Sequence, residues 1–199
     1  MEAWAHSSGP DVSGKFEAGH LLADHLRAVA ALAAGFSDGF GSREWGYLAG
    51  LWHDLGKYRD GFQRYIRQSR DPDAHIEGRV VGRDKTHSVA GALHAINTFG
   101  SGHGTLLAFL IAGHHAGLPD HEPSDGAGGS LKARLASDDG KREYAEAVAQ
   151  SIPADILTGE KPEVFFPGSA EGFALWLRML FSCLVDADFL DTEAYFDPE

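Results

Sequence analysis

Apolar residues recur at the spacing of an α-helix along most of the chain, and this periodicity most constrains the fold. In residues 17–36, apolar side chains fall on one face at about 100° per residue: Leu21, Leu22, Val29, Leu32 and Phe36. Residues 106–111 are apolar on nearly every side, which is typical of a buried central helix. No segment alternates strictly between apolar and polar residues, and Val80-Val81 is too short to count as a strand. The sequence therefore predicts an all-α fold.

Turn-forming and capping residues divide the rest of the chain into further helices. We expect helices over residues 45–55, 62–66, 87–99, 132–150 and 170–190, with N-caps at Ser42, Thr86 and Thr105. Residues 119–130 and 152–169 are interrupted by proline and glycine and are expected to be loops, the first a mobile loop over the site. The 132–150 helix is polar and peripheral, and nothing in it suggests chemistry. A chain of this size fits one domain, residues 1–199.

Charge and cysteine content narrow the possible functions and location. The net charge is −12, whereas a protein that binds nucleic acid tightly by itself usually presents a basic surface. We therefore do not expect unaided tight binding to DNA or RNA. A single cysteine, Cys183, rules out an internal disulfide, so the expected location is the cytoplasm. No apolar stretch approaches the roughly 20 residues of a membrane span, and the first residues show no secretory signal.

The run Leu51-Trp52-His53-Asp54-Leu55-Gly56-Lys57 carries the clearest chemical signal. Adjacent His53 and Asp54 at a helix end offer a metal ion one nitrogen and one carboxylate. We expect Gly56 to adopt the left-handed conformation that ends many helices, and Lys57 to contact a phosphate. An isolated His-Asp pair is more often an ordinary polar helix end. The chain contains 11 histidines, however, and histidine is the commonest metal ligand.

The helical periodicity selects further candidate ligands on buried faces. His25 lies within the apolar stripe of its helix, whereas His20 falls on the opposite, solvated side. In the last helix, Asp188 lies on the apolar face, where a carboxylate is costly unless it is paired or bound to metal. Asp186 lies nearly opposite, and both it and Asp191 are interpreted as ordinary surface acids. Asp188 is therefore the preferred candidate.

Two helix ends supply the remaining candidates. His87 opens a helix in which Gly91, one turn later, would let another helix approach closely. His114-His115 lies between glycines at the exit of the buried helix, a position suited to facing a cavity. The alternative for both is a packed or solvated histidine near a helix terminus. That alternative is favoured for His94, which lies deeper in its helix.

Together these residues fit a centre with two metal ions. The predicted ligands are His25, His53, Asp54, His87, His114, His115 and Asp188. A closed structural zinc site takes fewer ligands and usually includes cysteine. Two ions roughly 3.5–4 Å apart, bridged by the Asp54 carboxylate, account for the whole set. Imidazole and carboxylate ligands suit Mn, Ni, Co, Fe or Zn, and Mg is a further candidate, so the metal is left open.

The motifs occur in an order that resembles the HD superfamily of metal-dependent phosphohydrolases. Within it, the chain is most similar to the HD nuclease domain of the CRISPR-associated type I helicase–nuclease. The resemblance rests on these segments: Ala5-His6-Ser7, residues 25–30, residues 50–57 followed by Phe62-Gln63, residues 87–92, residues 113–117 and residues 184–188. It implies a single HD-domain helical bundle with the metal site between core helices.

The resemblance also implies an activity and partners. The predicted ligands would bind the metal, with His53, Asp54 and Lys57 at the centre of catalysis. The reaction would be metal-dependent cleavage of single-stranded DNA beside a crRNA–target hybrid. The partners would be a superfamily 2 helicase, as a domain or a subunit, and the crRNA-guided surveillance complex. One alternative is an HD phosphohydrolase of small nucleotides. Another is a non-catalytic metal-binding module, against which the cationic Lys57 counts.

Overall fold

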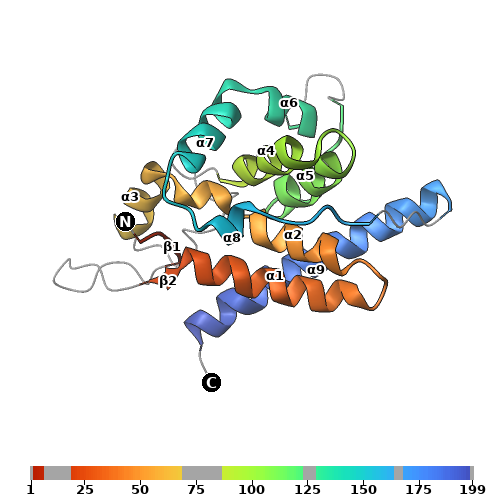
Figure 1. The fold of residues 1–199 in the computed structure, drawn as a ribbon, viewed down its shortest axis with the longest axis horizontal. Coiled ribbons are helices and arrows are strands. Elements are labelled where there is room, and N and C mark those ends of the chain that lie inside the picture. The colour runs from red at the N-terminus through yellow and green to blue at the C-terminus, as the bar shows by residue number, and fades with distance from the viewer. Residues whose placement is uncertain (1, 7–18, 69–86, 123–128, 164–167, 198–199) are drawn as a thin grey trace.

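The computed structural model describes residues 2–6, 19–68, 87–122, 129–163 and 168–197, and these are mostly helical (Figure 1). The helices are α1 (Leu22–Asp38), α2 (Arg43–Trp52), the 3₁₀ helix η1 (Leu55–Tyr58), α3 (Asp60–Gln68), α4 (Ser88–Phe99), α5 (His103–Gly113), α6 (Leu131–Ala136), α7 (Asp138–Val148), α8 (Ala154–Leu157) and α9 (Ala170–Phe196). The predicted all-α fold is confirmed. A small antiparallel pair, β1 (Trp4–His6) with β2 (His20–Leu21), was not predicted, because strands this short leave no alternation to detect.

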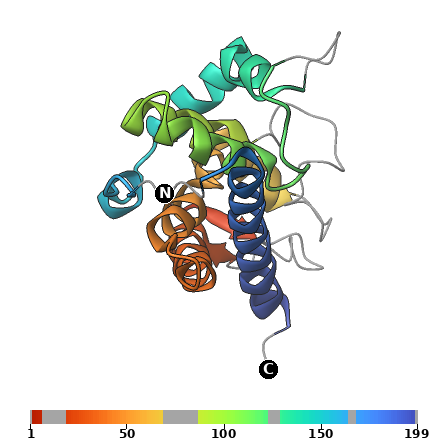
Figure 2. The ribbon, with the colours of Figure 1, turned by 90° about the vertical axis from the view of Figure 1, so that its right-hand side faces the viewer.

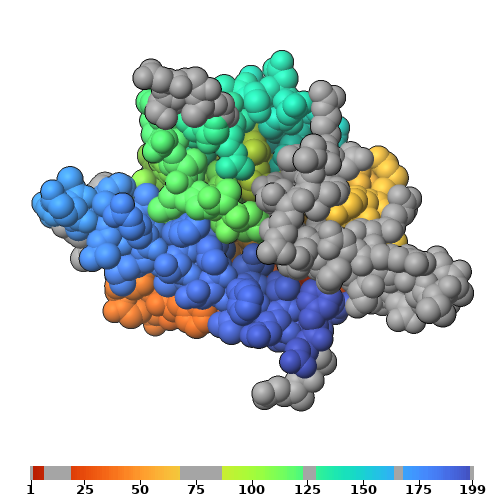
Figure 3. Space-filling model, turned by 180° about the vertical axis from the view of Figure 1, so that it is seen from behind, coloured from red at the N-terminus to blue at the C-terminus, as the bar shows by residue number. Residues whose placement is uncertain are grey.

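Two helix pairs and one long helix form the bundle. α1 packs on α2, α4 packs on α5, and α9 contacts α1, α2 and α5 (Figures 1 and 2). From behind, α9 crosses the molecule with its outer side open to solvent (Figure 3). α7 covers α4 on the side away from α1. No helix within the described ranges combines the length and apolar character that crossing a membrane requires.

The core lies between these helices and is apolar, as the sequence predicted for α5. Leu107, Leu110 and Ile111 of α5 are fully buried. So are Trp45 and Trp52 of α2, which donate indole hydrogen bonds to the carbonyls of residues 163 and 156. Burying the indole N–H with a partner avoids the penalty of an unsatisfied donor. The core therefore holds α2, and the His53-Asp54 step that follows it, rigidly.

Glycines set how closely the helices approach at this step. A Cβ on Gly91 would collide with the carbonyl of Trp52, so the close approach predicted at Gly91 is confirmed. The prediction for Gly56 is wrong: it lies within η1 and is not among the glycines with positive φ. A Cβ on Gly56 would instead collide with the backbone of His87. Gly56 is therefore needed for close packing, which brings the start of α4 against the His53-Asp54 step.

Several helix boundaries differ from the predictions for local reasons. α1 begins at Leu22 rather than residue 17, because His20 and Leu21 pair with β1. The predicted 132–150 helix is two helices that meet at Ser137, whose hydroxyl caps α7 by accepting a hydrogen bond from the Gly140 N–H. α9 continues to Phe196, beyond the predicted end. The 152–169 segment contains the short helix α8.

The three predicted N-caps have different outcomes in the structure. Ser42 precedes α2, but its side chain makes no capping bond and instead accepts a hydrogen bond from the Trp176 indole. Thr105 lies inside α5, which begins at His103, so that prediction is wrong. Thr86, and residues 123–128 of the predicted loop over the site, lie outside the described residues.

Candidate metal centre

Asp54 is the centre of the site. It is fully buried at the step between α2 and η1, and its two carboxylate oxygens face different sets of histidines. Oδ1 lies 3.1 Å from His87 Nε2 and 3.5 Å from His114 Nε2. Oδ2 lies 3.3 Å from His53 Nε2 and 3.5 Å from His25 Nε2. The carboxylate thus has the geometry of a bridge between two ligand groups.

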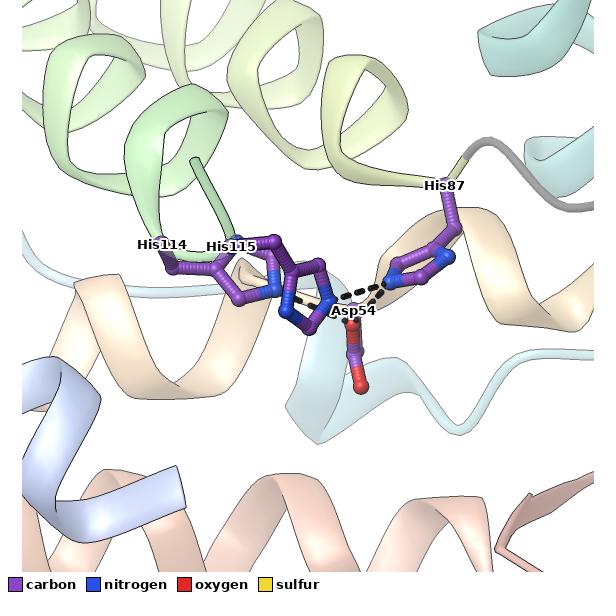
Figure 4. Close-up of side chains that lie close together, drawn as sticks. All are labelled: Asp54, His87, His114 and His115. Carbon is purple, nitrogen blue, oxygen red and sulfur yellow. Dashed lines mark hydrogen bonds and ion pairs between the residues drawn. The ribbon is translucent and has the colours of Figure 1, made fainter. Parts of the chain in front are cut away.

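The first of these, the His87 group, consists of Asp54, His87, His114 and His115 (Figure 4). His87 is the residue before α4, and the two adjacent histidines follow the end of α5. Their rings converge on Asp54 from the two helix ends, and the Nε2 atoms of His87 and His115 lie 2.8 Å apart. Asp54 supplies the only carboxylate among these four residues.

The second, the His25 group, consists of His25, His53, Asp54 and Asp188. The Nε2 atoms of the two histidines lie 3.3 Å apart, and Asp188 Oδ1 is 3.4 Å from the first and 3.5 Å from the second. His25 and Asp188 project from within α1 and α9, and His53 caps the end of α2. This group contains two carboxylates.

Hydrogen bonds on the far side of three rings fix their orientation. The Nδ1–H of His53 donates to the Gly50 carbonyl, and that of His114 donates to the Ile111 carbonyl, each at 2.7 Å. His25 Nδ1 lies 2.6 Å from Asp191 Oδ2. Because carbonyls only accept, Nδ1 carries a proton in both rings, and in the neutral rings the Nε2 atoms of His53 and His114 carry lone pairs that face the centre. A ligand histidine held by its other nitrogen is the usual arrangement in metal sites.

The donor set fits divalent cations. Neither oxygen of buried Asp54 receives a directed hydrogen bond, and neither does buried His114 Nε2. Lys57 Nζ lies 2.5 Å from Asp54 Oδ2, a charge contact without the directionality of a hydrogen bond. Imidazoles and carboxylates converging at about 3 Å are stabilised by a bound cation or, in the metal-free protein, by protons on the rings. Imidazole with carboxylate suits transition-metal ions.

Electrostatics differ between the two groups. Burial alone would raise the pKa of Asp54, but the charges of His53 and Lys57 hold it well below its usual value. Burial opposes protonation of His25, yet hydrogen bonds to Asp188 and Asp191 raise its pKa to about 10. The pKa of His53 rises to about 9, since the nearby carboxylates outweigh burial.

His115 in the His87 group behaves in the opposite way. Burial is the main cause that lowers its pKa, and the neighbouring His114 and His87 lower it further. A ring that stays neutral is ready to donate its lone pair to a metal at any physiological pH. The His25 group, by contrast, attracts positive charge strongly.

The structure brings all the predicted ligands into these two groups. His25 and Asp188, chosen by helix face, point to Asp54, whereas Asp186 is exposed. Lys57 is buried, with its ammonium against Asp54. Metal binding by these residues, and phosphate binding by Lys57, stay predictions.

Two neighbours of the His25 group were misjudged from the sequence. Asp191 was interpreted as a surface acid, which is wrong: it accepts the His25 hydrogen bond. It lies three residues after Asp188, hence on the same helix face, so the periodicity carried the signal. His20 was predicted to be solvated but is half-buried, with its ring stacked on Tyr195 at 5.0 Å.

Other histidines make packing contacts, and one of them, His6, also lies with His20 and His25 in a third set of imidazoles close enough to share an ion. His6 is buried, with its ring 4.7 Å from that of His25 and its Nε2 3.1 Å from Thr192 Oγ1. His94, as expected, packs edge-on against Trp52 and donates to the Leu157 carbonyl. Cys183 is buried, and burial raises the pKa of its thiol, in keeping with an inert cysteine.

The family model for the HD domain matches residues 22–155. The chain belongs to the HD domain family. Membership implies a metal-dependent phosphohydrolase that binds divalent metal, in agreement with the two ligand groups. The matched region of the HD domain holds the predicted histidine ligands, Asp54 and Lys57, but it ends before α9, which supplies Asp188. No curated protein matches the chain.

Proposed function

We propose that this HD domain hydrolyses phosphodiester bonds of single-stranded DNA, with two divalent ions, in CRISPR type I interference. The observation that carries the two-ion chemistry is the shared carboxylate of Asp54, whose two oxygens face separate ligand groups. The DNA substrate rests on the resemblance of the ordered motifs to the type I HD nuclease domain.

The residues have distinct roles in this proposal. The histidines would hold and orient the ions, and Asp54 keeps the two ligand groups at a fixed spacing. Divalent ions, when bound, would lower the pKa of a water molecule and neutralise charge on the phosphate. Lys57, at 2.5 Å from Asp54 Oδ2, favours the ionised carboxylate, and it would add a positive charge near a phosphate bound at the ions.

The proposed partners are a superfamily 2 helicase and the crRNA-guided surveillance complex, in the cytoplasm. The net charge of −12 supports delivery of the DNA by partners, because an acidic chain gains little from counterion release on DNA. The same charge favours the competing proposal, an HD phosphohydrolase of small nucleotides, since a small substrate needs no basic surface. Both use the same residues.

One assay separates the two proposals. Purified protein is incubated with Mn²⁺, Ni²⁺ or Co²⁺ and either circular single-stranded DNA or small cyclic and triphosphate nucleotides. We expect cutting of the circle that EDTA abolishes and that Asp54→Ala lowers by more than about 100-fold. Asp186→Ala, which removes an exposed carboxylate two residues from Asp188, is the matched control and should retain activity.

Other outcomes of this assay would contradict the proposals. Rapid turnover of small nucleotides with inert single-stranded DNA would replace the nuclease by the small-nucleotide enzyme. Full cutting by Asp54→Ala, or cutting that survives EDTA, would overturn the two-ion mechanism for either substrate.

A further inference from the structure

The His87 group depends on the relative position of two helix ends. His87 precedes α4, and His114 and His115 follow α5, so none of the three is held within a regular helix. A small shift of either end would separate Nε2 atoms that now lie 2.8 Å apart. α4 and α5 pack directly on each other, and a side chain bonded to both ends would fix their relative position further.

Arg134 of α6 connects these ends directly. Its Nη1 donates a 2.6 Å hydrogen bond to the carbonyl of Ala112, and its Nη2 donates a 2.8 Å hydrogen bond to Ser88 Oγ. Ser88 adjoins His87 in the chain, and Ala112 lies two residues before His114. The planar guanidinium satisfies two acceptors with fixed geometry, and a cation is favoured at the carbonyl end of a helix.

α7, which follows the Arg134 helix in the chain, is anchored on the start of α4. Buried Glu143 accepts a 2.9 Å hydrogen bond from the backbone N–H of Ala90, in the first turn of α4. A carboxylate there satisfies a helix-end donor and interacts well with the helix dipole. A Cβ on Gly140 would lie 2.7 Å from Val89 Cγ1, so α7 packs closely on α4. α7 is therefore held firmly on α4, and α6, which carries Arg134, packs against both helices.

We propose that Arg134 is a positioning residue for the His87 group. It holds the start of α4 and the end of α5 so that the three imidazoles converge on Asp54 Oδ1. Within the described part of the chain, no contact joins Arg134 to a member of the His25 group. The inference rests on the proposed two-ion function, and it assigns a role to a helix in which the sequence suggested no chemistry.

The test counts bound ions rather than products. Calorimetric titration of the metal-free protein with Mn²⁺, and the absorption spectrum of the Co²⁺-loaded protein, are compared for wild type, Arg134→Met, Arg134→Lys and Ser88→Ala. Arg142→Met is the matched control, because Arg142 is exposed on α7 and pairs with the acidic side chains of Asp139 and Glu146.

We expect wild type and Arg142→Met to bind two ions. In Arg134→Met one of the two should bind about 10–100-fold more weakly, with the other unchanged, as is usual when support behind a ligand is lost. Arg134→Lys should recover little, since one ammonium does not reproduce the two-pronged contact. Ser88→Ala, which removes a single acceptor, should show a smaller loss at the same ion.

Two results would overturn the inference: wild-type affinity for both ions in Arg134→Met, or equal weakening of both, which would indicate a general structural role. If circular dichroism shows that Arg134→Met does not fold, Ser88→Ala decides by the same criterion. A wild-type protein that binds only one ion would instead refute the two-ion function itself, so the two failures are distinguishable.

Discussion

The two halves of the metal centre share Asp54 but are built differently. The His25 group takes His25 and Asp188 from within long helices, α1 and α9, whose packing in the core fixes them. The His87 group takes its histidines from two helix ends, which peripheral helices hold in place. The first group gains its order from the core and the second from hydrogen bonds at the surface of the bundle.

The His25 and His87 groups also differ in their charge. The His25 group has two carboxylates, with Asp191 behind it, and the pKa values of His25 and His53 rise to about 10 and about 9. The His87 group has only the shared Asp54 carboxylate, and the pKa of His115 falls. An ion in the His25 group therefore meets more negative charge. We expect that group to bind its ion more tightly.

The largest effect should come from removing the charge that both halves share. Asp54→Asn keeps the side-chain shape but loses the carboxylate, so both ions should bind more than about 100-fold more weakly. Calorimetric titration with Mn²⁺ measures this, with Asp186→Asn as the control. Selective loss of one ion would show that Asp54 is not a bridge.

Single histidines should separate the halves. His87→Ala should abolish binding of the weaker ion and spare the tighter one, whereas His25→Ala should do the reverse. Each variant should lose most of the hydrolytic activity, because the proposed mechanism needs both ions. Co²⁺ spectra resolve the two positions. Identical spectra for the two variants would refute the assignment of separate groups.

A smaller and one-sided effect is expected from Asp191→Asn. The amide no longer stabilises a protonated or metal-bound His25, so the tighter ion should lose about 10–100-fold in affinity and the weaker ion almost nothing. The pKa of His25, followed by NMR in the metal-free protein, should fall. Asp24→Asn, an exposed substitution on α1, is the control.

pH should affect the halves unequally. Below pH 9 the metal-free His25 and His53 hold protons that a metal must displace, so affinity for the tighter ion should rise with pH. The rise is about tenfold per pH unit for each displaced proton and should level off above about pH 10. The weaker ion should respond less, because His115 is already neutral. Titration in buffers of different ionisation enthalpy counts the protons released.

Helical periodicity predicted the part of the site that the core determines. It selected His25 over His20 and Asp188 over Asp186, because buried faces repeat with the helix. Asp191 was recoverable by the same logic. Its role was missed because Asp191 was interpreted as an ordinary surface acid near the end of the helix.

Two other features, the role of Arg134 and the reason for Gly56, arise from tertiary contact. Arg134 acts on residues 22 and 46 positions away in the chain, and a polar helix gives no sign of which backbone atoms it meets. Gly56 was assigned a turn conformation, whereas the reason for a glycine there is the His87 backbone packed against it. The local sequence pattern does not reveal such close contacts between distant backbone segments.

α9 supplies the last residue of the candidate metal centre to be made. Asp188, a predicted ligand in the His25 group, is made after every other predicted ligand, and it reaches the site only when α9 packs on α1, α2 and α5. A growing chain that already contains the whole HD-matched region still lacks this carboxylate. The His25 group therefore has only one of its two carboxylates until α9 has been made and has packed on the other helices.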